Sequence, residues 1–470
     1  MGSKLFKLFI SLVFSVSTLY AQADLEDDLA GFDTIGEKVT EEFSELDGFE
    51  DDTLLTLEDQ KELKEKPSRI KLSGDLAFKT AYSIKEHKVD GVDYRGFNQA
   101  QTSLYVQLDT RLKDNFKLRM STDLFYDAIY DLHPNTNYND DILDAYKTQV
   151  RLDDVYIQGS LLNNLDIKLG RQIVIWGKSD SIRITDVINP LDNRLPGLTD
   201  IEDLRLPTTM LKLDYYVGDW EISAMAIGES RIMIEAPARS EFFNVDALFS
   251  GAPNPFLELE EPDNSVDNMQ YAFAANGIFS GWDLSFYAAD VLDQKWHIEN
   301  NKRVVSKVKM AGSALNIAYG NWLLKTEAAY LNGIRYNSTI DSKNRLDLLV
   351  GFDYMGFRDA TISVEVSNRH IYDYEIQMQS GMDYVDQDEM QTALRYTKNF
   401  LNDTLDISVL LSMFGSSWEN GGFSRLWFEY DIIDALNTEF GYVEYIGGDK
   451  PFLEINKDND RLFASLKYSF

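Results

Sequence analysis

Apolar and polar residues alternate with a period of two over most of the chain from Ser68 to the end. In the first such segment, which begins at Ile70, the even-numbered positions are mostly apolar and the odd-numbered ones mostly small or polar. Alternation of this kind places successive side chains on opposite faces of a β-strand. A half-buried soluble sheet alternates in the same way, so this pattern alone leaves a soluble sheet and a membrane barrel both open.

The connections between the alternating segments are short and long in turn. The short ones carry the Gly, Asn or Asp that hairpin turns need. Short turns on one side and long polar loops on the other are typical of an outer-membrane barrel. One opening strand, eight hairpins and one closing strand give 18 strands, so we expect an all-β fold, a transmembrane antiparallel β-barrel of about 18 (16–18) strands. The eight short connections are Lys113-Asp114-Asn115, Leu162-Asn163-Asn164, Val217-Gly218-Asp219, Ser280-Gly281-Trp282, Gly320-Asn321, Phe357-Arg358-Asp359, Leu401-Asn402-Asp403 and Ile433-Asp434-Ala435.

The last segment and the prolines agree with this expectation. The chain ends on an alternating apolar face that includes Leu466, Tyr468 and the terminal Phe470. Such an ending resembles the assembly signal of outer-membrane barrels, which implies recognition of Phe470 by the barrel-assembly machinery and contact with outer-membrane lipids. Of ten prolines, only Pro207 falls on an expected strand, at its first residue. Proline should avoid spanning strands because lipid offers no water to replace a lost ladder hydrogen bond.

The first 23 residues have the features of a signal peptide. Lys4 and Lys7 precede a short apolar core at 8–16, and Ala21-Gln22-Ala23 is an A-x-A cleavage site. We therefore expect export and a mature chain that starts at Asp24. No later apolar stretch approaches the ~20 residues that a spanning helix needs. An exported chain without such a helix is periplasmic, fully secreted or a barrel.

Residues 24–67 form an acidic segment that we expect to be a disordered periplasmic arm, followed by the barrel at 68–470. Residues 24–66 contain 17 Asp or Glu and 4 Lys, a net charge of −13, and repulsion at that density opposes compaction. Within the arm the pattern acid-Leu-x-Gly-Phe-acid occurs twice, 17 residues apart. The arm is either a solvated tether or a pair of short motifs that bind a periplasmic partner with increased avidity. The partner-binding candidates are Leu29, Gly31, Phe32, Leu46, Gly48 and Phe49.

Charge and residue types exclude several classes of function. The net charge of −33 argues against nucleic acid as a partner. The chain has no Cys, and we expect no metal site and no cofactor. His87, His133 and His297 lie in expected loops, while His370 ends a strand, three residues after Ser367. No motif of a hydrolase or metalloprotease accompanies them, so we expect no catalytic residues and no enzyme activity.

The stretch 170–194 is the most distinctive part of the barrel sequence. It leaves the fifth strand and enters a long loop rich in both signs of charge. Strict alternation would point Arg171 into lipid, at a cost of ~2–4 kcal/mol near mid-bilayer, so we expect Gly170 to form a bulge that turns Arg171 inward. The loop then either folds into the lumen as a constriction or lies exposed. The constriction candidates are Arg171, Gln172, Trp176, Lys178, Arg183, Asp186, Asn189, Asp192 and Arg194.

Three motifs in this stretch, Gly170-Arg171-Gln172, Trp176-Gly177 and Asn189-Pro190, resemble those of a large family of proteobacterial outer-membrane barrels. Members are often encoded beside RND-type transporters, which implies a role in lipid or hydrophobic-molecule transport and an inner-membrane partner of that type. Alginate-export and other substrate-specific porins are similar in strand pattern only. We therefore expect a porin-like outer-membrane channel of an export or lipid-transport system. The alternative is a closed barrel that serves as the outer-membrane component of a transporter complex and docks through its acidic arm.

The loop at 229–268 is the longest connection and contains four prolines. Loops of this length are usually functional or disordered. The sequence leaves three roles open for it: a lid, a plug or a surface epitope.

Overall fold

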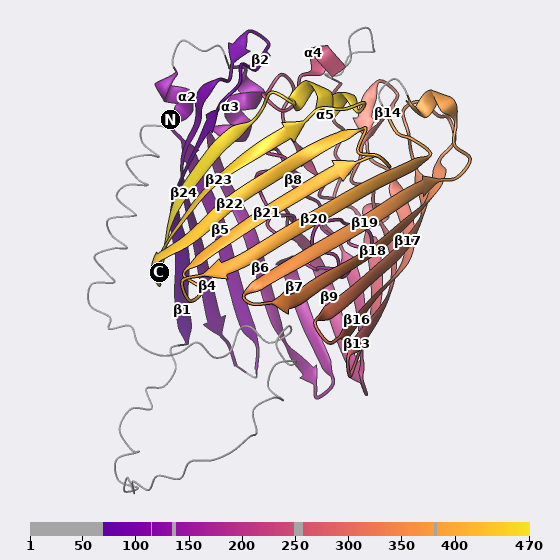
Figure 1. Ribbon diagram of the computed structural model, residues 1–470. Coiled ribbons are helices and arrows are strands. Elements are labelled where there is room, and N and C mark those ends of the chain that lie inside the picture. The colour runs from indigo at the N-terminus through magenta and orange to yellow at the C-terminus, as the bar shows by residue number, and fades with distance from the viewer. Residues whose placement is uncertain (1–68, 114, 134–137, 249–256, 380–382) are drawn as a thin grey trace, which may run out of the picture. The chain divides into compact units, whose positions relative to one another are not determined.

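The computed structural model describes residues 69–113, 115–133, 138–248, 257–379 and 383–470. Eighteen strands form one closed antiparallel sheet, a β-barrel that confirms the expected fold class and strand count (Figure 1). Within these residues no helix has both the length and the apolar character to cross a membrane. The expected signal peptide, and the arm with both Leu-x-Gly-Phe motifs, lie outside the described residues.

Each barrel strand pairs with its neighbours in sequence order, and the last strand returns to the first. The strands are β1 (Ile70–Ser83), β4 (Gly96–Arg111), β5 (Lys117–Asp127), β6 (Thr148–Leu162), β7 (Leu165–Gln172), β9 (Thr208–Val217), β10 (Trp220–Ile227), β12 (Gln270–Phe279), β13 (Trp282–Leu292), β16 (Lys307–Tyr319), β17 (Trp322–Ile334), β18 (Lys343–Phe357), β19 (Ala360–Ile371), β20 (Asp388–Phe400), β21 (Leu405–Phe414), β22 (Gly421–Ile433), β23 (Leu436–Ile446) and β24 (Arg461–Ser469). The long connections hold the short elements β2 (Lys88–Val89), β3 (Val92–Asp93), β8 (Asp192–Asn193), β11 (Ile234–Glu235), β14 (His297–Glu299), β15 (Lys302–Val304), α2 (Ile129–Leu132), α3 (Asp140–Tyr146), α4 (Val245–Leu248) and α5 (Pro451–Asn456), and the 3₁₀ turns η1 (Val266–Asn268) and η2 (Ile376–Gln379).

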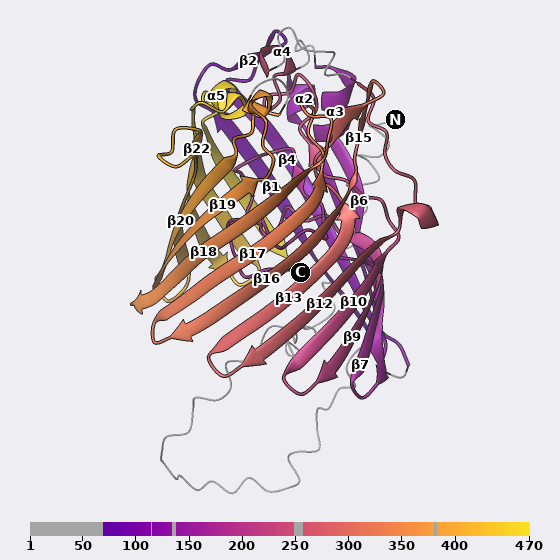
Figure 2. The same cartoon turned by 90° about the vertical axis from the view of Figure 1, so that its right-hand side faces the viewer.

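All eight expected short connections join neighbouring strands at one end of the barrel, and the long connections gather at the other (Figures 1 and 2). Residues with positive φ, such as Asn115, Gly218 and Asp359, lie in these tight turns, where Gly, Asn and Asp tolerate the left-handed conformation best. Pro207 lies one residue before β9 rather than on it. None of the described prolines interrupts a barrel strand.

The barrel closes between its first and last strands. The pairing of β1 with β24 runs from Ser83 opposite Arg461 to Asp75 opposite Ser469. At the end of this seam Gly74 and Phe470 exchange two backbone hydrogen bonds of 2.9 Å. A side chain on Gly74 would meet the carbonyl oxygen of Tyr105 on β4 at 2.3 Å and the Phe470 ring at 3.0 Å, so glycine fits between these two neighbours.

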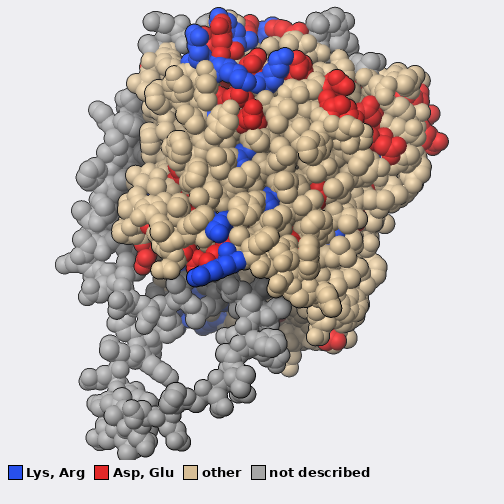
Figure 3. Space-filling view, viewed as in Figure 1, with Lys and Arg blue, Asp and Glu red and all other residues tan. Residues whose placement is uncertain are grey.

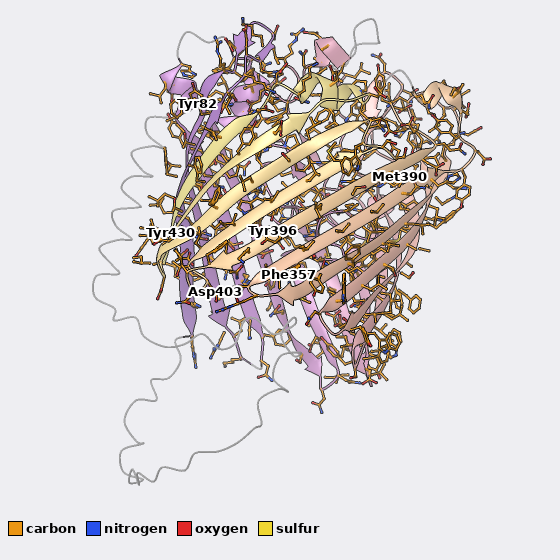
Figure 4. All side chains as sticks on the ribbon, in the orientation of Figure 1. Tyr82, Phe357, Met390, Tyr396, Asp403 and Tyr430 are labelled. Carbon is orange, nitrogen blue, oxygen red and sulfur yellow. The ribbon has the colours of Figure 1, made fainter. Side chains whose placement is uncertain are left out.

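The outer surface of the barrel is an apolar band bordered by aromatic side chains. Leucine, valine and phenylalanine side chains that point outward are exposed, as at Phe78 (48%) and Val350 (56%). Charged residues are sparse across the middle of the visible face and denser toward its ends (Figure 3). Tyr82 lies near the long-loop end, and Tyr430 and Phe357 lie nearer the turns (Figure 4). This arrangement suits a hydrocarbon layer with interfacial girdles at both edges.

The expected bulge at Gly170 is wrong. The pairing of β7 with both neighbours continues without a register shift through Gly170 and Arg171. Arg171 therefore stays on the outer face, and its guanidinium bonds the Glu229 carboxylate at 2.6 Å. Burial alone would raise the pKa of Glu229, but hydrogen bonds from Thr209 and the charge of Arg171 outweigh it and lower the pKa. Gly170 has φ +131°, which favours glycine, and a Cβ there would also meet the Val155 carbonyl oxygen at 2.1 Å.

Candidate functional site

The chain leaves the barrel wall after Gln172 and returns to it at Thr208, and the segment between them, 173–207, is here called the lumen loop. Asn189 clamps its two ends together. The Asn189 side-chain oxygen accepts from the backbone N–H of Val174 at 2.8 Å, and its amide donates to the carbonyl oxygen of Leu206 at 2.9 Å. Asn189 and Gln172 are both fully buried. These two members of the sequence motifs therefore set how the loop leaves the wall.

The Trp176-Gly177 pair leads the lumen loop along the inner wall toward β13 and β17. The Trp176 ring stacks on Tyr287 of β13 with centroids 4.7 Å apart. Gly177 has φ +90°, and a Cβ at this position would lie 2.7 Å from a carboxylate oxygen of Glu327. Glycine is needed here both for the conformation and for the close approach to the carboxylate.

Two glutamates on the inner wall hold the tip of the lumen loop. Glu327 of β17 accepts hydrogen bonds from the backbone N–H groups of Lys178 (2.5 Å), Ser179 (2.8 Å) and Thr185 (3.1 Å) and from the Thr185 hydroxyl (2.7 Å). Both carboxylates are nearly inaccessible to solvent. Charged acceptors of this kind form the stronger class of hydrogen bond. The loop tip is therefore tied to the wall through its own backbone.

Glu365 of β19 binds the next part of the loop tip. It accepts from the hydroxyl of Ser179 at 2.7 Å and from the backbone N–H groups of Asp180 and Ser181 at 2.9 and 3.0 Å. Lys325 of β17 adds an ion pair to Asp180. These strands lie five to eight places away from β7 and β9 around the eighteen-stranded sheet, so the loop spans part of the lumen rather than lying exposed.

Charged side chains within the lumen loop pair mainly with one another and with the wall. Asp186 lies between Arg183 (3.1 Å) and Arg205 (2.8 Å). Arg369 of β19 donates to the carbonyl oxygen of Arg183 at 3.2 Å. The carbonyl oxygen of Asn189 accepts from Arg183 at 2.8 Å. The constriction candidates Gln172, Arg183, Asp186 and Asn189 thus lie together inside the barrel, as does Trp176.

The remaining candidates lie toward the edges of this cluster. Asp192 pairs with Arg194 at 2.5 Å and with Arg151 of β6 at 3.4 Å. Lys178 is 3.8 Å from Asp283 on the β13 wall. Arg171 is the one candidate that points away from the lumen, because it lies on the outer face of β7.

The far end of the lumen loop reaches the wall formed by β20–β23. Asp200 pairs with Arg395 of β20 at 3.1 Å and with Arg425 of β22 at 3.0 Å. Arg425 also pairs with Glu439 of β23 at 2.8 Å. The carbonyl oxygen of Pro196 accepts from the Tyr445 hydroxyl at 2.6 Å. The loop is therefore attached at this end to β20, β22 and β23, in addition to β17 and β19 at its tip.

The longest connection, 228–269, is here called the lid and packs among the other long connections. Its Phe242 side chain is fully buried and lies against Tyr445 and the guanidinium of Arg461, whose central carbon is 4.6 Å from the ring. Glu241 pairs with Arg461 at 3.2 Å. The parallel pairing of β11 with β8 joins the lid to the lumen loop. The name refers only to this position among the long connections; the three roles left open by the sequence stay predictions.

The sequence motifs identified the loop but not the wall residues that receive it. On the inner wall, Glu365, Arg425 and Arg461 bond to loop residues. The only local signal is a carboxylate on the inward face of a strand, which a water-filled barrel would also show. Ser367 and His370 lie on opposite faces of β19, since three positions separate them. The described residues contain no cluster of His, Asp or Glu suited to a metal ion.

Comparison with known proteins gives a family and a fold. The model of a family described as "Protein of unknown function (DUF1302)" matches residues 74–470. No protein matches in a search of curated sequences. The solved structure of OccK1 (OpdK) from Pseudomonas aeruginosa is 11% identical with a TM-score of 0.50, over 85% of this chain and 98% of that chain.

Two Acinetobacter baumannii proteins are also similar in structure. OccAB1 is 11% identical with a TM-score of 0.49, over 85% of this chain and 96% of that one. DcaP, described as an outer membrane channel, is 10% identical with a TM-score of 0.42, over 85% and 97%. At these identities the likeness concerns the fold alone, a porin-like barrel.

Proposed function

The chain belongs to the family described as "Protein of unknown function (DUF1302)", and on that premise we propose that it is an outer-membrane channel whose lumen loop sets what passes. The observation that carries the proposal is the pair of wall carboxylates, Glu327 and Glu365, that hold this loop across the lumen. A barrel of 18 strands is too wide for wall side chains alone to fill. A fixed loop inside it therefore determines the width and the charge of any path.

An outer-membrane location is supported by the surface of the barrel. A monomeric soluble protein rarely exposes a contiguous apolar patch larger than a few hundred Å². Here the outward positions of successive strands are apolar around the barrel, with examples in Phe273, Leu348 and Leu394. A closed sheet leaves no unpaired strand edge in lipid, which the hydrocarbon core requires.

Residues 24–67 are proposed to lie in the periplasm and to bind a periplasmic or RND-type inner-membrane partner. Ile70, where β1 begins, pairs with Thr110 beside the first short turn, and short turns of such barrels face the periplasm. The family resemblance described above supports a place in an envelope export or lipid-transport system. The assembly machinery would recognise Phe470.

A second candidate function, a closed barrel that docks through the arm, is favoured by the number of loop attachments. The lumen loop contacts β17, β19, β20 and β22 through bonded side chains, and the lid packs against β23 and β24. A path through so many fixed contacts would conduct poorly without a conformational change.

Single-channel conductance in planar bilayers separates these candidates. The protein without residues 1–23 is compared with a variant that also lacks 24–66, and with one in which 178–187 is replaced by a Gly-Ser linker of equal length. A channel conducts with or without the arm, and its conductance rises when the linker replaces the loop tip. A barrel that stays closed in all three forms contradicts the channel proposal. Capture of an inner-membrane transporter by the intact arm would then support the second candidate.

A further inference from the structure

A cavity of about 460 Å³ lies between the lumen loop, the lid and the inner wall formed by β20–β22. Its volume falls within the range of small-molecule sites, ~300–1,000 Å³. The residues around it come from four separate parts of the chain, the two loops, the wall and α5. Neither Glu327 nor Glu365 borders it, but Asp180 and Ser181 of the loop tip, which bond to Glu365, do.

The wall of this cavity departs from the polar interior that a channel normally has. Leu410 and Phe414 of β21 and Phe423 of β22 border it, all on inward positions. Neighbouring inward positions on β21 are the buried serines Ser408 and Ser412. Large apolar side chains that face the lumen of a water-filled barrel gain nothing from hydration. Phe423 packs against the buried cluster of Phe242, Val443 and Tyr445, whereas Leu410 and Phe414 stay half-buried and leave apolar surface beside the open space.

The loops complete the apolar lining from the other side. Leu191 and Ile201 of the lumen loop and Phe243 of the lid border the same space. Phe452 of α5, with 40% of its surface exposed, also borders it. Aromatic and aliphatic side chains from the wall, the loop and the lid thus surround one volume.

The polar groups of the cavity favour an uncharged ligand. Among the bordering residues, Asp180, Asp200 and Glu235 are acidic and only Arg395 is basic. Arg395 is already paired with Asp200 at 3.1 Å. An anionic group would therefore meet more carboxylates than guanidinium groups. Gln391, whose amide donates to the Ser412 hydroxyl at 3.2 Å, offers a neutral hydrogen-bonding partner.

We propose that this cavity binds an uncharged amphipathic small molecule, with an apolar ring or chain body and one hydrogen-bonding head such as a hydroxyl or carbonyl. The body lies against Leu410, Phe414 and Phe423, and the head lies toward Gln391 and Ser412. The inference rests on the proposed function, because it names the class of molecule that the channel carries.

Equilibrium dialysis tests the proposal with 1-naphthol and 1-naphthoate, which share a ring system and differ in charge at pH 7. The full barrel is placed in lipid nanodiscs, and uptake by empty nanodiscs is subtracted. We expect saturable binding of 1-naphthol and at least about tenfold weaker binding of 1-naphthoate. Absence of saturable 1-naphthol binding, or stronger binding of 1-naphthoate, overturns the proposal.

Matched variants locate the binding. Leu410→Trp fills the cavity from the wall and Ile201→Trp fills it from the loop, and each should weaken 1-naphthol binding about tenfold or more. Val409→Trp is the control, because Val409 is the neighbour of Leu410 that points outward and is 38% exposed. It should bind as the native protein does. Equal binding by all three variants contradicts the assignment, and Ile201→Trp keeps the test valid if Leu410→Trp fails to fold.

Conductance measured on the same protein separates this inference from the function it rests on. A barrel that conducts ions but does not bind 1-naphthol overturns the ligand class and leaves the channel proposal intact. A barrel that binds 1-naphthol but never conducts overturns the channel and leaves the cavity assignment intact.

Discussion

The lumen loop and the lid are both long connections at one end of the same barrel, yet they are held by different forces. The lumen loop presents backbone N–H groups to the buried carboxylates of Glu327 and Glu365. The lid inserts one aromatic ring, Phe242, and adds the buried ion pair between Glu241 and Arg461. Hydrogen bonds to a fixed charge specify one backbone position, whereas an inserted ring is held mainly by non-directional apolar contact. The lumen loop is therefore held mainly through its backbone N–H groups, and the lid mainly through the side chains of Phe242 and Glu241.

The largest expected effect comes from truncating the lid's aromatic anchor. Phe242→Ala should cost about 3–5 kcal/mol of local stability, as for other buried Phe→Ala changes. Hydrogen exchange should then rise steeply across the described part of 228–269 and stay unchanged at 177–187. Phe452→Ala is the control, since Phe452 is an exposed aromatic of neighbouring α5. An equal rise in hydrogen exchange in the lid and in the lumen loop would contradict their separate attachment.

Removal of one wall charge tests the lumen loop in the same way. Glu327→Gln keeps the shape but turns an amide N–H₂ toward donors, which should cost about 2–3 kcal/mol because hydrogen bonds to a charged group are lost. Amide exchange at 178–185 should increase while the lid keeps its protection. Glu221→Gln is the matched control, because Glu221 is an inward glutamate of β10 that accepts from Ser223 of the same strand. If Glu327→Gln leaves amide exchange at 178–185 unchanged, the loop is held by other contacts.

The clamp at the base of the lumen loop should matter less. Asn189→Ala leaves the N–H of Val174 and the carbonyl of Leu206 without their partners, at an expected cost of about 1–3 kcal/mol. Thermal unfolding of the detergent-solubilised barrel measures the loss. Asn399→Ala provides the comparison, since Asn399 forms its side-chain bond in an exposed turn. If Asn189→Ala also changes the single-channel conductance and Asn399→Ala does not, the difference between the two positions becomes clearer.

The smallest expected effect is a pH dependence of the stability of the β14–β15 hairpin, with none in the lumen loop. Burial lowers the pKa of His297 in the β14–β15 hairpin, against the opposing charge of Glu299. The folded hairpin therefore binds fewer protons than the unfolded one, so its stability is present above the unfolded pKa of about 6.5 and declines as pH falls below it. Hydrogen exchange of 297–304, corrected for intrinsic rates, should increase between pH 7.5 and 5.5. His297→Gln should abolish this difference, and 177–187 should show none.

Local patterns predicted the barrel well because strands and tight turns are encoded by near neighbours. Alternation and turn residues such as Gly218 and Asn402 were enough to count 18 strands. The receiving residues of the lumen loop could not be found in this way, since the bond from Lys178 to Glu327 joins positions 149 residues apart. The period-two alternation of apolar and polar residues does not indicate which residues so far apart in the sequence will bond.

The error at Gly170 has a similar origin. The sequence predicts a bulge there because it shows no partner for an outward arginine in lipid. Its partner, Glu229, is 58 positions away and follows the end of β10. The motif residues Gln172, Trp176 and Asn189 hold the loop in its path, and the sequence alone could not show that role, since it depends on partners far away in the chain.

The seam between β1 and β24 has a consequence for how the chain is made. Ser469 bonds Asp75 across 394 positions, and Phe470 completes the last rung with Gly74. A nascent or truncated chain without its final strand retains two bare sheet edges, which are templates for wrong partners. Only a chain that includes β24 can pair both edges, so closure of the barrel has to wait until this strand has been made.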